Sequence, residues 1–208
     1  MKLSPVIAPV LLLALSLSAC GDDEDPTTPP TSASPTATAS ASATAEAPKS
    51  SADLVMAPGR IGPAEVGMSK SEALETGLFD ADVKIKGEVC DGVEPLQWKS
   101  AFTGVDVLTS EAGDIVSLGT FEADGPRTED DLGVGSTYGD LVDTYGAELT
   151  DPEEAGYGQA GAYVKDGNRW LGFLFGDVES ASAVVSDTEV TFVEATAGDK
   201  PGLMRDGC

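Results

Sequence analysis

The sequence contains no histidine among its 208 residues. Without an imidazole, Ser-His-Asp and Cys-His nucleophile systems, histidine general bases and the common zinc sites are excluded. No Ser or Thr stands three residues before a Lys, no Lys follows a Gly, and no CxxC pair occurs. A simple Ser-Lys nucleophile, a phosphate-binding P-loop and a thioredoxin-type redox motif are therefore absent too. We expect no catalytic residues, no cofactor and no metal.

Positive charge is scarce, because 36 acidic residues stand against 12 basic ones and the formal net charge is −24. Nucleic acid and anionic lipid headgroups would repel such a chain, so we expect neither as a direct partner. Two of the many carboxylates flanking a groove could in principle hydrolyse a glycosidic bond. The acidic stretch from Glu122 to Asp131 lacks the spacing of an EF-hand, and it is interpreted as a solvated linker or, alternatively, as a weak calcium site.

The one long apolar run lies at the N-terminus, from Val6 to Leu17. At about a dozen residues it is too short for a permanent transmembrane helix, and it predicts a signal peptide over residues 1–19. The sequence LSAC at residues 17–20 resembles the lipobox of bacterial lipoproteins. The resemblance implies that Cys20 is acylated and becomes the first residue of the mature chain, which holds it firmly to the membrane. An ordinary cleavage site beside an unrelated cysteine is the alternative.

Residues 20–53 follow as a segment rich in Thr, Ser, Ala and Pro, with no aromatic and no large aliphatic residue between Gly21 and Ala52. Such a segment cannot bury enough apolar surface to offset the entropy of ordering it, so it predicts a disordered linker. The linker would hold the rest of the chain clear of the lipid surface. We therefore expect a protein anchored to the cell membrane on its extracytoplasmic side.

Two further cysteines, Cys90 and Cys208, lie beyond the linker. In an oxidising compartment outside the cytoplasm, an isolated pair most simply forms one disulfide. This bridge would close a long loop and would attach the C-terminal tail to the first half of the chain. Two free thiols and an intermolecular bridge are the alternatives.

A sequence pattern occurs twice, as VGMSKSEALETG over residues 66–77 and as VGSTYGDLVDTYG over residues 134–146. In each copy a hydroxyl residue precedes an acid by three positions, Ser69 before Glu72 and Thr137 before Asp140. This is the capping-box pattern, so each stretch predicts a helix start, and the closing glycine predicts an end about two turns later. An anion site on the free N–H groups of each helix start is the alternative.

Strand patterns follow each predicted helix. The sequence PLQWKSAF over residues 95–102 alternates as a half-buried strand, and VDVLTS with DIVSLGTF predicts a hairpin around residues 111–114. A second hairpin is predicted around Asp166-Gly167, with an interior second strand, and TEVTFVEAT adds one more strand. Trp98 and Trp170 lie on these strands, as core residues or as aromatics of an exposed binding face.

The order of short helices and antiparallel strands, led by Gly67-Met68-Ser69 and by Gly135-Ser136-Thr137, resembles the repeat of beta-lactamase inhibitor protein and of the small outer-membrane lipoprotein of the barrel-assembly machinery. It is also similar to uncharacterised lipoproteins of actinobacteria that carry paired units behind a Thr/Ser/Pro stalk. The resemblance implies an α+β fold of two tandem repeats, over residues 54–126 and 127–208. Each repeat would consist of short helices followed by an antiparallel sheet of about three strands.

These features together favour a lipid-anchored, extracytoplasmic, non-catalytic module that binds a protein or cell-wall partner. A cell-wall glycan hydrolase with paired carboxylates is the alternative from another class. A spacer or assembly lipoprotein is the third hypothesis.

Overall fold

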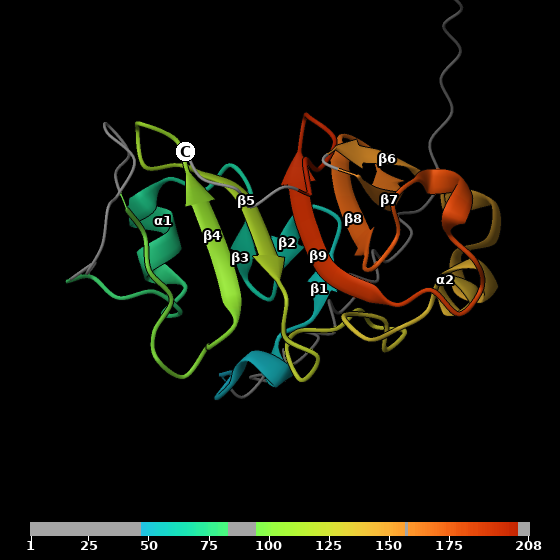
Figure 1. Ribbon diagram of the computed structural model, residues 1–208. Helices are drawn as coiled ribbons and strands as arrows, with labels where there is room; N and C mark the ends of the chain where they lie inside the picture. The colour runs from blue at the N-terminus through green and yellow to red at the C-terminus, as the bar shows by residue number, and fades with distance from the viewer. Residues whose placement is uncertain (1–46, 83–94, 157, 204–208) are drawn as a thin grey trace, which may run out of the picture. The chain divides into compact units, whose positions relative to one another are not determined.

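An antiparallel sheet of six strands forms the centre of the fold, in the order β4-β5-β9-β8-β7-β6 (Figure 1). The computed structural model describes residues 47–82, 95–156 and 158–203. The six strands are β4 (Val105–Thr109), β5 (Ile115–Thr120), β6 (Glu153–Gly156), β7 (Gln159–Asp166), β8 (Arg169–Phe175) and β9 (Val190–Ala197).

A smaller antiparallel sheet and two short α-helices accompany the large sheet. The small sheet has the order β1-β2-β3, with β1 (Met56–Ala57), β2 (Arg60–Ile61) and β3 (Ala64–Glu65). The α-helices are α1 (Lys70–Glu75) and α2 (Tyr138–Tyr145), and single 3-10 turns cover Ser51–Asp53, Gly146–Glu148 and Ala181–Ala183. The first of these turns lies in the last residues of the predicted linker, where Ser51 is buried and donates a hydrogen bond to the Thr103 carbonyl.

The predicted α+β fold of two tandem helix-and-sheet repeats is wrong, because the described chain is mostly β. The two helices have only 6 and 8 residues. Strand β9, from the end of the chain, pairs with β5 on one edge and with β8 on the other. Strands from both sides of residue 126 therefore share one sheet, and Figure 1 shows β5 and β9 side by side. Two separate sheets would leave the edges of these apolar strands unpaired, which is unfavourable.

Both predicted hairpins are confirmed. Strands β4 and β5 pair antiparallel, as do β7 and β8, and β8 is an interior strand. The second loop lies one residue further along than expected, since Asp166 pairs with Arg169 and leaves Gly167 and Asn168 as the two loop residues. Gly167 takes a φ of 60°, a left-handed conformation that suits glycine.

The predicted strand over residues 95–102 is wrong. Its one bridge in the described chain pairs Trp98 with Phe79, and the following residues form turns, one of them closed by a hydrogen bond from Phe102 N to Lys99 O at 2.8 Å. Alternation of apolar residues arises here because Leu96, Trp98 and Phe102 each point into the core from an irregular segment. The alternation of apolar and polar residues thus shows which side chains are buried, although the segment does not pair with a neighbouring strand over its length.

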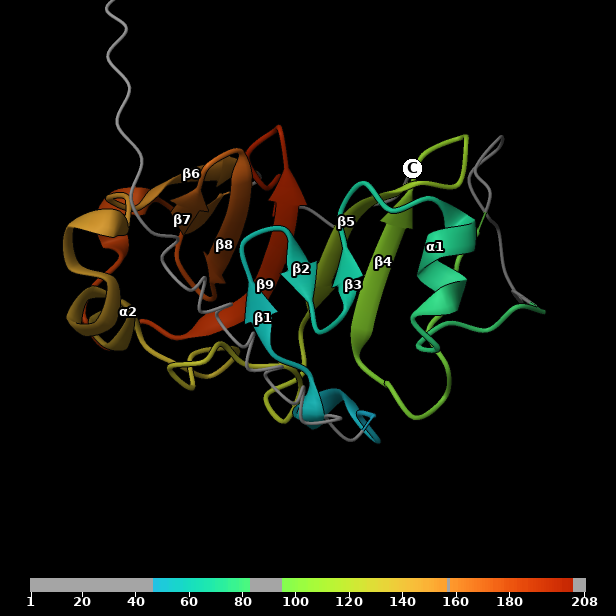
Figure 2. The same cartoon turned by 180° about the vertical axis from the view of Figure 1, so that it is seen from behind.

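The large sheet packs its first face against the small sheet and both helices. Figure 2 shows β1, β2 and β3 in front of β5 and β9, with α1 near β4 and α2 at the opposite end. One hydrophobic cluster joins all of these elements, and its members include Ile61 of β2, Ala73 of α1, Leu141 of α2, Leu118 of β5 and Phe173 of β8. Burial of a large apolar side chain contributes about 1.5–3 kcal/mol, so this cluster is the main source of stability.

The second face of the large sheet holds a smaller cluster. Tyr163 of β7, Leu174 of β8 and Phe192 of β9 pack there with Leu203, which comes after the last strand. Leu203 is only 1% exposed. The C-terminal segment of residues 199–203 therefore covers the centre of this face.

Candidate binding site

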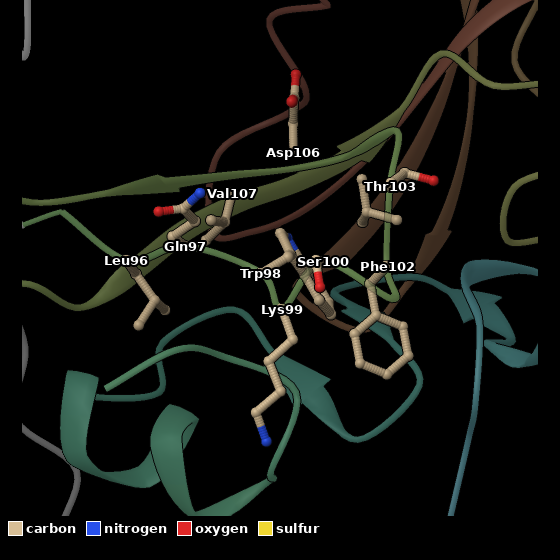
Figure 3. Close-up of a pocket in the computed structure, with 10 residues that line it drawn as sticks. Leu96, Gln97, Trp98, Lys99, Ser100, Phe102, Thr103, Asp106 and Val107 are labelled. Carbon is tan, nitrogen blue, oxygen red and sulfur yellow. The ribbon is translucent and has the colours of Figure 1, made fainter. Parts of the chain in front are cut away.

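A cleft of about 350 Å³ lies between strand β4 and the irregular segment that precedes it. It is lined by Leu96, Gln97, Trp98, Lys99, Ser100, Phe102, Thr103, Val105, Asp106 and Val107. Gln97, Ser100 and Thr103 are exposed, whereas the aromatic and leucine side chains among them are buried. Figure 3 shows Trp98 in the middle of these residues. The rim of the cleft is polar and its base is apolar, as in sites for small ligands.

Trp98 is fixed by two aromatic neighbours. Its ring centroid lies 4.4 Å from that of Phe79 and 6.0 Å from that of Phe102, in tilted and edge-on arrangements that aromatic pairs favour. The side chain is 6% exposed, and its indole Nε1 is buried and has no hydrogen-bond partner among the residues that the structure describes. A buried donor without an acceptor costs about 1–3 kcal/mol, so the packing of this ring by its neighbours has to offset that cost.

Backbone hydrogen bonds hold the segment that carries Trp98. Lys99 N donates to Leu78 O, and Asp80 N donates to Gln97 O, both at 2.9 Å. The carbonyl of Thr103 accepts from Ser51 Oγ at 3.0 Å. The lining of the cleft is thus attached to two other parts of the chain, which makes it a preformed surface.

Two charged residues, Lys99 and Asp106, line the cleft. Lys99 Nζ donates a hydrogen bond to Gly77 O, and Figure 3 shows the Lys99 side chain extending away from Asp106 and Thr103. Its ammonium group therefore lies away from the polar rim. Asp106 of the lining belongs to β4.

The second tryptophan singled out from the sequence lies elsewhere. Trp170 is half-buried on the second face of the large sheet, where Lys165 Nζ lies 4.4 Å from its ring centroid. Its Nε1 donates to Gly198 O at 3.4 Å. Trp98 belongs to the large hydrophobic cluster and Trp170 packs against the small one. The structure therefore does not bring the two tryptophans together on one binding face.

The two predicted capping boxes are both present. Ser69 N donates to Glu72 Oε2 at 2.8 Å, and Glu72 N donates to Ser69 Oγ at 3.4 Å. The second box has the same form, with 2.8 Å from Thr137 N to Asp140 Oδ2 and 3.2 Å from Asp140 N to Thr137 Oγ1. These bonds satisfy backbone donors that an anion would need, which favours the capping role over the anion site.

The same hydrogen bonds lower two carboxyl pKa values. The hydroxyl of Ser69, with its backbone N–H, lowers the pKa of Glu72. The backbone N–H of Thr137, with its hydroxyl, lowers the pKa of Asp140. Both carboxylates are held in their charged form and act as structural caps.

An arginine organises the acidic stretch that was considered for calcium. Arg127 Nε lies 2.7 Å from Asp131 Oδ1, and the Arg127 guanidinium also donates to Asp131 O, Val134 O and Ser136 Oγ. Within the described ranges, no three acidic, histidine or cysteine side chains gather as a set of metal ligands. The side chain of Arg127 therefore holds the conformation of this stretch.

A buried carboxylate that the sequence reasoning missed lies on the second sheet face. Glu194 of β9 is 4% exposed. Its Oε2 accepts from Leu203 N at 2.7 Å, and its Oε1 accepts from Ser117 Oγ of β5. An acid in the middle of the apolar stretch TFVEAT was the available signal, since a buried carboxylate needs partners of this kind.

Two glycines make room for the segment that covers Glu194. A Cβ on Gly161 would lie 2.4 Å from Leu203 Cδ1, and a Cβ on Gly172 would lie 2.9 Å from Pro201 Cβ. Lys200 Nζ adds an ion pair with Glu153 and lies 4.5 Å from the Tyr163 ring centroid. The C-terminal segment therefore fits a notch that the sheet leaves open for it.

The cysteines named from the sequence, Cys20, Cys90 and Cys208, lie outside the described residues. Comparison of the chain with family models, with curated proteins and with solved structures gives no match. In the described part of the chain, no helix has the length and apolar character to cross a bilayer.

Proposed function

We propose that this chain is a lipid-anchored, extracytoplasmic, non-catalytic binding module for a protein or cell-wall partner, and that it binds through the Trp98 cleft. The observation that carries this function is the cleft of about 350 Å³, which has exposed Gln97, Ser100 and Thr103 on its rim.

The N-terminal sequence supports the proposed location. A signal-like apolar run ends at Cys20 within LSAC, and a Thr/Ser/Ala/Pro-rich segment separates this cysteine from the folded part. A multiply acylated cysteine holds a chain firmly at a membrane, and a linker of about 30 residues spans roughly 30 Å when it is flexible. The cleft would then face partners in the cell envelope.

The electrostatics favour binding over glycan hydrolysis. A glycosidase needs one carboxyl with a raised pKa, which stays protonated to act as the acid. In the described part of the chain, the carboxyl groups whose pKa departs clearly from its usual value are Asp53, Glu72 and Asp140, and hydrogen bonds from nearby backbone and hydroxyl groups lower the pKa of each. The direction is opposite to the one that hydrolysis requires.

The anchor is tested by Cys20→Ser. We expect this variant to leave the membrane fraction and to appear in the medium, because the acylated thiol is lost. Fractionation followed by immunoblotting against the folded part measures the distribution. Retention of the variant in the membrane fraction would overturn the lipid anchor.

The cleft is tested by Ser100→Tyr, which places a ring on the rim without changing the buried base. A matched control is Ser182→Tyr, at an exposed serine far along the chain in the 3-10 turn Ala181–Ala183. We expect Ser100→Tyr to lower retention of the full chain on purified cell walls or on solubilised envelope proteins at least tenfold, and Ser182→Tyr to leave it unchanged. Equal retention of both variants would contradict binding at the cleft, and release of soluble sugar from the walls by the unaltered chain would support hydrolysis instead.

A further inference from the structure

We propose that the second face of the large sheet is a peptide-binding groove, and that the C-terminal segment of residues 199–203 occupies it as an internal ligand. The external ligand is an extended segment of another protein, with a basic residue three positions before a large aliphatic residue. It binds by displacing the C-terminal segment. This groove is separate from the Trp98 cleft, so it adds a second binding surface to the proposed function.

The floor of the groove is built by strands that pair with one another. Strand β8 pairs with β7 on one edge and with β9 on the other. Tyr163, Leu174 and Phe192 of these three strands form an apolar cup on the second face. Gly161 and Gly172 leave space above the strands, because a Cβ on them would lie 2.4 Å and 2.9 Å from atoms of the C-terminal segment. The groove is therefore a feature of the sheet itself.

The C-terminal segment lies in this groove as a short peptide ligand would. Leu203 is 1% exposed and packs in the apolar cup, and its backbone N–H donates to Glu194 Oε2 at 2.7 Å. Lys200 Nζ forms an ion pair with Glu153 and lies 4.5 Å from the ring centroid of Tyr163. An apolar anchor in a pocket, combined with a main-chain hydrogen bond, is a common mode of peptide recognition.

The segment can leave the groove without breaking the sheet. It holds no strand of the sheet, and it follows β9 through Gly198, which has a φ of 82°. Leu203 has a φ of 55°, a left-handed conformation that is unfavourable for leucine. A segment from another protein is not tied to β9, so its anchor residue can adopt a relaxed backbone. Such a ligand gains the same contacts without this strain.

The carboxylates of the groove determine which segments fit. The side chain of Glu153 is 44% exposed beside Lys200, so a basic residue finds a partner there and an acidic one is repelled. Glu194 is buried and accepts from both Ser117 Oγ and the N–H of Leu203. The anchor residue of a ligand must therefore supply a backbone N–H, which excludes proline at that position.

The test titrates the full chain with the peptide N-acetyl-Asp-Lys-Pro-Gly-Leu-amide, which repeats residues 199–203. A reductant is present, so that a Cys90–Cys208 bridge would not hold the segment in place. The indole N–H signal of Trp170 in a ¹⁵N-labelled sample reports binding, because its Nε1 donates to Gly198 O, and Trp170→Phe assigns this signal. We expect Leu203→Ala to bind the peptide at least tenfold more tightly than the unaltered chain, because its groove is open for a larger fraction of the time.

Two altered peptides test the ligand class on the Leu203→Ala chain. Glu in place of Lys should weaken binding two- to fivefold, as expected for one exposed ion pair, and Asp in place of Leu should weaken it at least tenfold. Adding Glu153→Lys to the chain should reverse the preference, so that the peptide with Glu binds more tightly than the one with Lys.

A second variant weakens the segment without changing the core. Lys200→Glu alters a side chain that is 39% exposed and opposes it to Glu153. It should raise the affinity of the full chain for the Lys peptide two- to fivefold, and it decides the question if Leu203→Ala does not fold. Ser100→Tyr, at the Trp98 cleft, is the control and should leave peptide binding unchanged.

Three outcomes would overturn the proposal. If neither Leu203→Ala nor Lys200→Glu binds the peptide more tightly than the unaltered chain, the segment is a fixed part of the fold and the groove is not a binding site. Equal binding of the Lys and Glu peptides would reject a basic ligand. Dimers of the unaltered chain that the peptide dissociates would identify the ligand as the C-terminal segment of a second copy in place of another protein.

Discussion

The two faces of the six-stranded sheet are covered in different ways. The first face packs against β1–β3, α1 and α2 within one large hydrophobic cluster. The second face has four buried cluster members, and one of them, Leu203, comes from the C-terminal segment. A buried carboxylate, Glu194, binds the backbone of that segment. The first face is therefore held by apolar area, whereas the second depends on a short segment fixed by a few specific contacts.

The largest expected effect is on the first face. Phe173→Ala removes a fully buried ring at the centre of the large cluster, next to Tyr145 of α2 at a centroid distance of 6.1 Å. We expect the free energy of unfolding to fall by about 3–5 kcal/mol, because a cavity remains between elements that cannot close it. Urea denaturation followed by circular dichroism measures this loss. A loss below about 1 kcal/mol would show that the first face is not the main core.

A smaller and more local effect is expected on the second face. Leu203→Ala should lower the free energy of unfolding by about 2–3 kcal/mol, near the lower end for a buried leucine, because the terminal segment can detach instead of leaving a cavity. Hydrogen exchange should speed up at residues 199–203 and stay unchanged in α1 and α2. Gly202→Ala is the control, since a Cβ there would meet nothing within 4 Å. Uniformly faster exchange over the whole sheet would mean that the segment does not open separately.

Glu194→Gln tests the polar contact under the segment. The amide keeps the shape of the side chain, but only one of its two ends accepts, while both Leu203 N and Ser117 Oγ now donate to the carboxylate. We expect a loss of about 1–3 kcal/mol from the donor left without an acceptor. The double variant with Leu203→Ala should lose less than the sum of the two, because the residues are in contact. Additive losses would show that Glu194 does not act through the segment.

The sequence predicted local features of this fold better than its overall architecture. The caps at Ser69 and Thr137 and the two hairpins depend on neighbouring residues, and spacing alone shows them. The position of β9 between β5 and β8 depends on pairing between distant strands, which periodicity does not encode. The repeated helix starts therefore suggested a duplicated fold, although the strands after them join one sheet.

The candidate site was visible only in part. Trp98 was singled out as a core residue or a binding aromatic, and the structure shows it buried while it lines a cleft. The position of this side chain beside a cleft depends on three-dimensional packing, so no sequence pattern could reveal it. The acid within TFVEAT was a signal for Glu194, but its contact with Leu203, 9 positions further along, depends on packing across the sheet face.

The smallest expected effect concerns the pKa values of two tyrosines, one on each face of the sheet. Burial, with the nearby charges of Glu153 and Glu194, raises the pKa of Tyr163 on the second face to about 12. Burial, with the charge of Asp130, also raises the pKa of Tyr145 on the first face, against a hydrogen bond from Thr128 that lowers it. The unfolded chain ionises its tyrosines near pH 10, so it loses protons that the folded chain keeps. Folding stability should therefore fall as the pH rises from about 10 to 12.

Site-resolved titration of the tyrosine ring carbons separates the two contributions. Leu203→Ala should bring the pKa of Tyr163 down toward 10 and leave that of Tyr145 raised, because only the second face becomes more open to water. Phe173→Ala should lower the pKa of Tyr145 and leave that of Tyr163 raised, because the Phe173 ring lies against Tyr145. If Leu203→Ala lowers both pKa values equally, the C-terminal segment stabilises the whole sheet, and the two faces are not independent. If it lowers only that of Tyr163, the segment is a separate cover that can open while the first face stays closed.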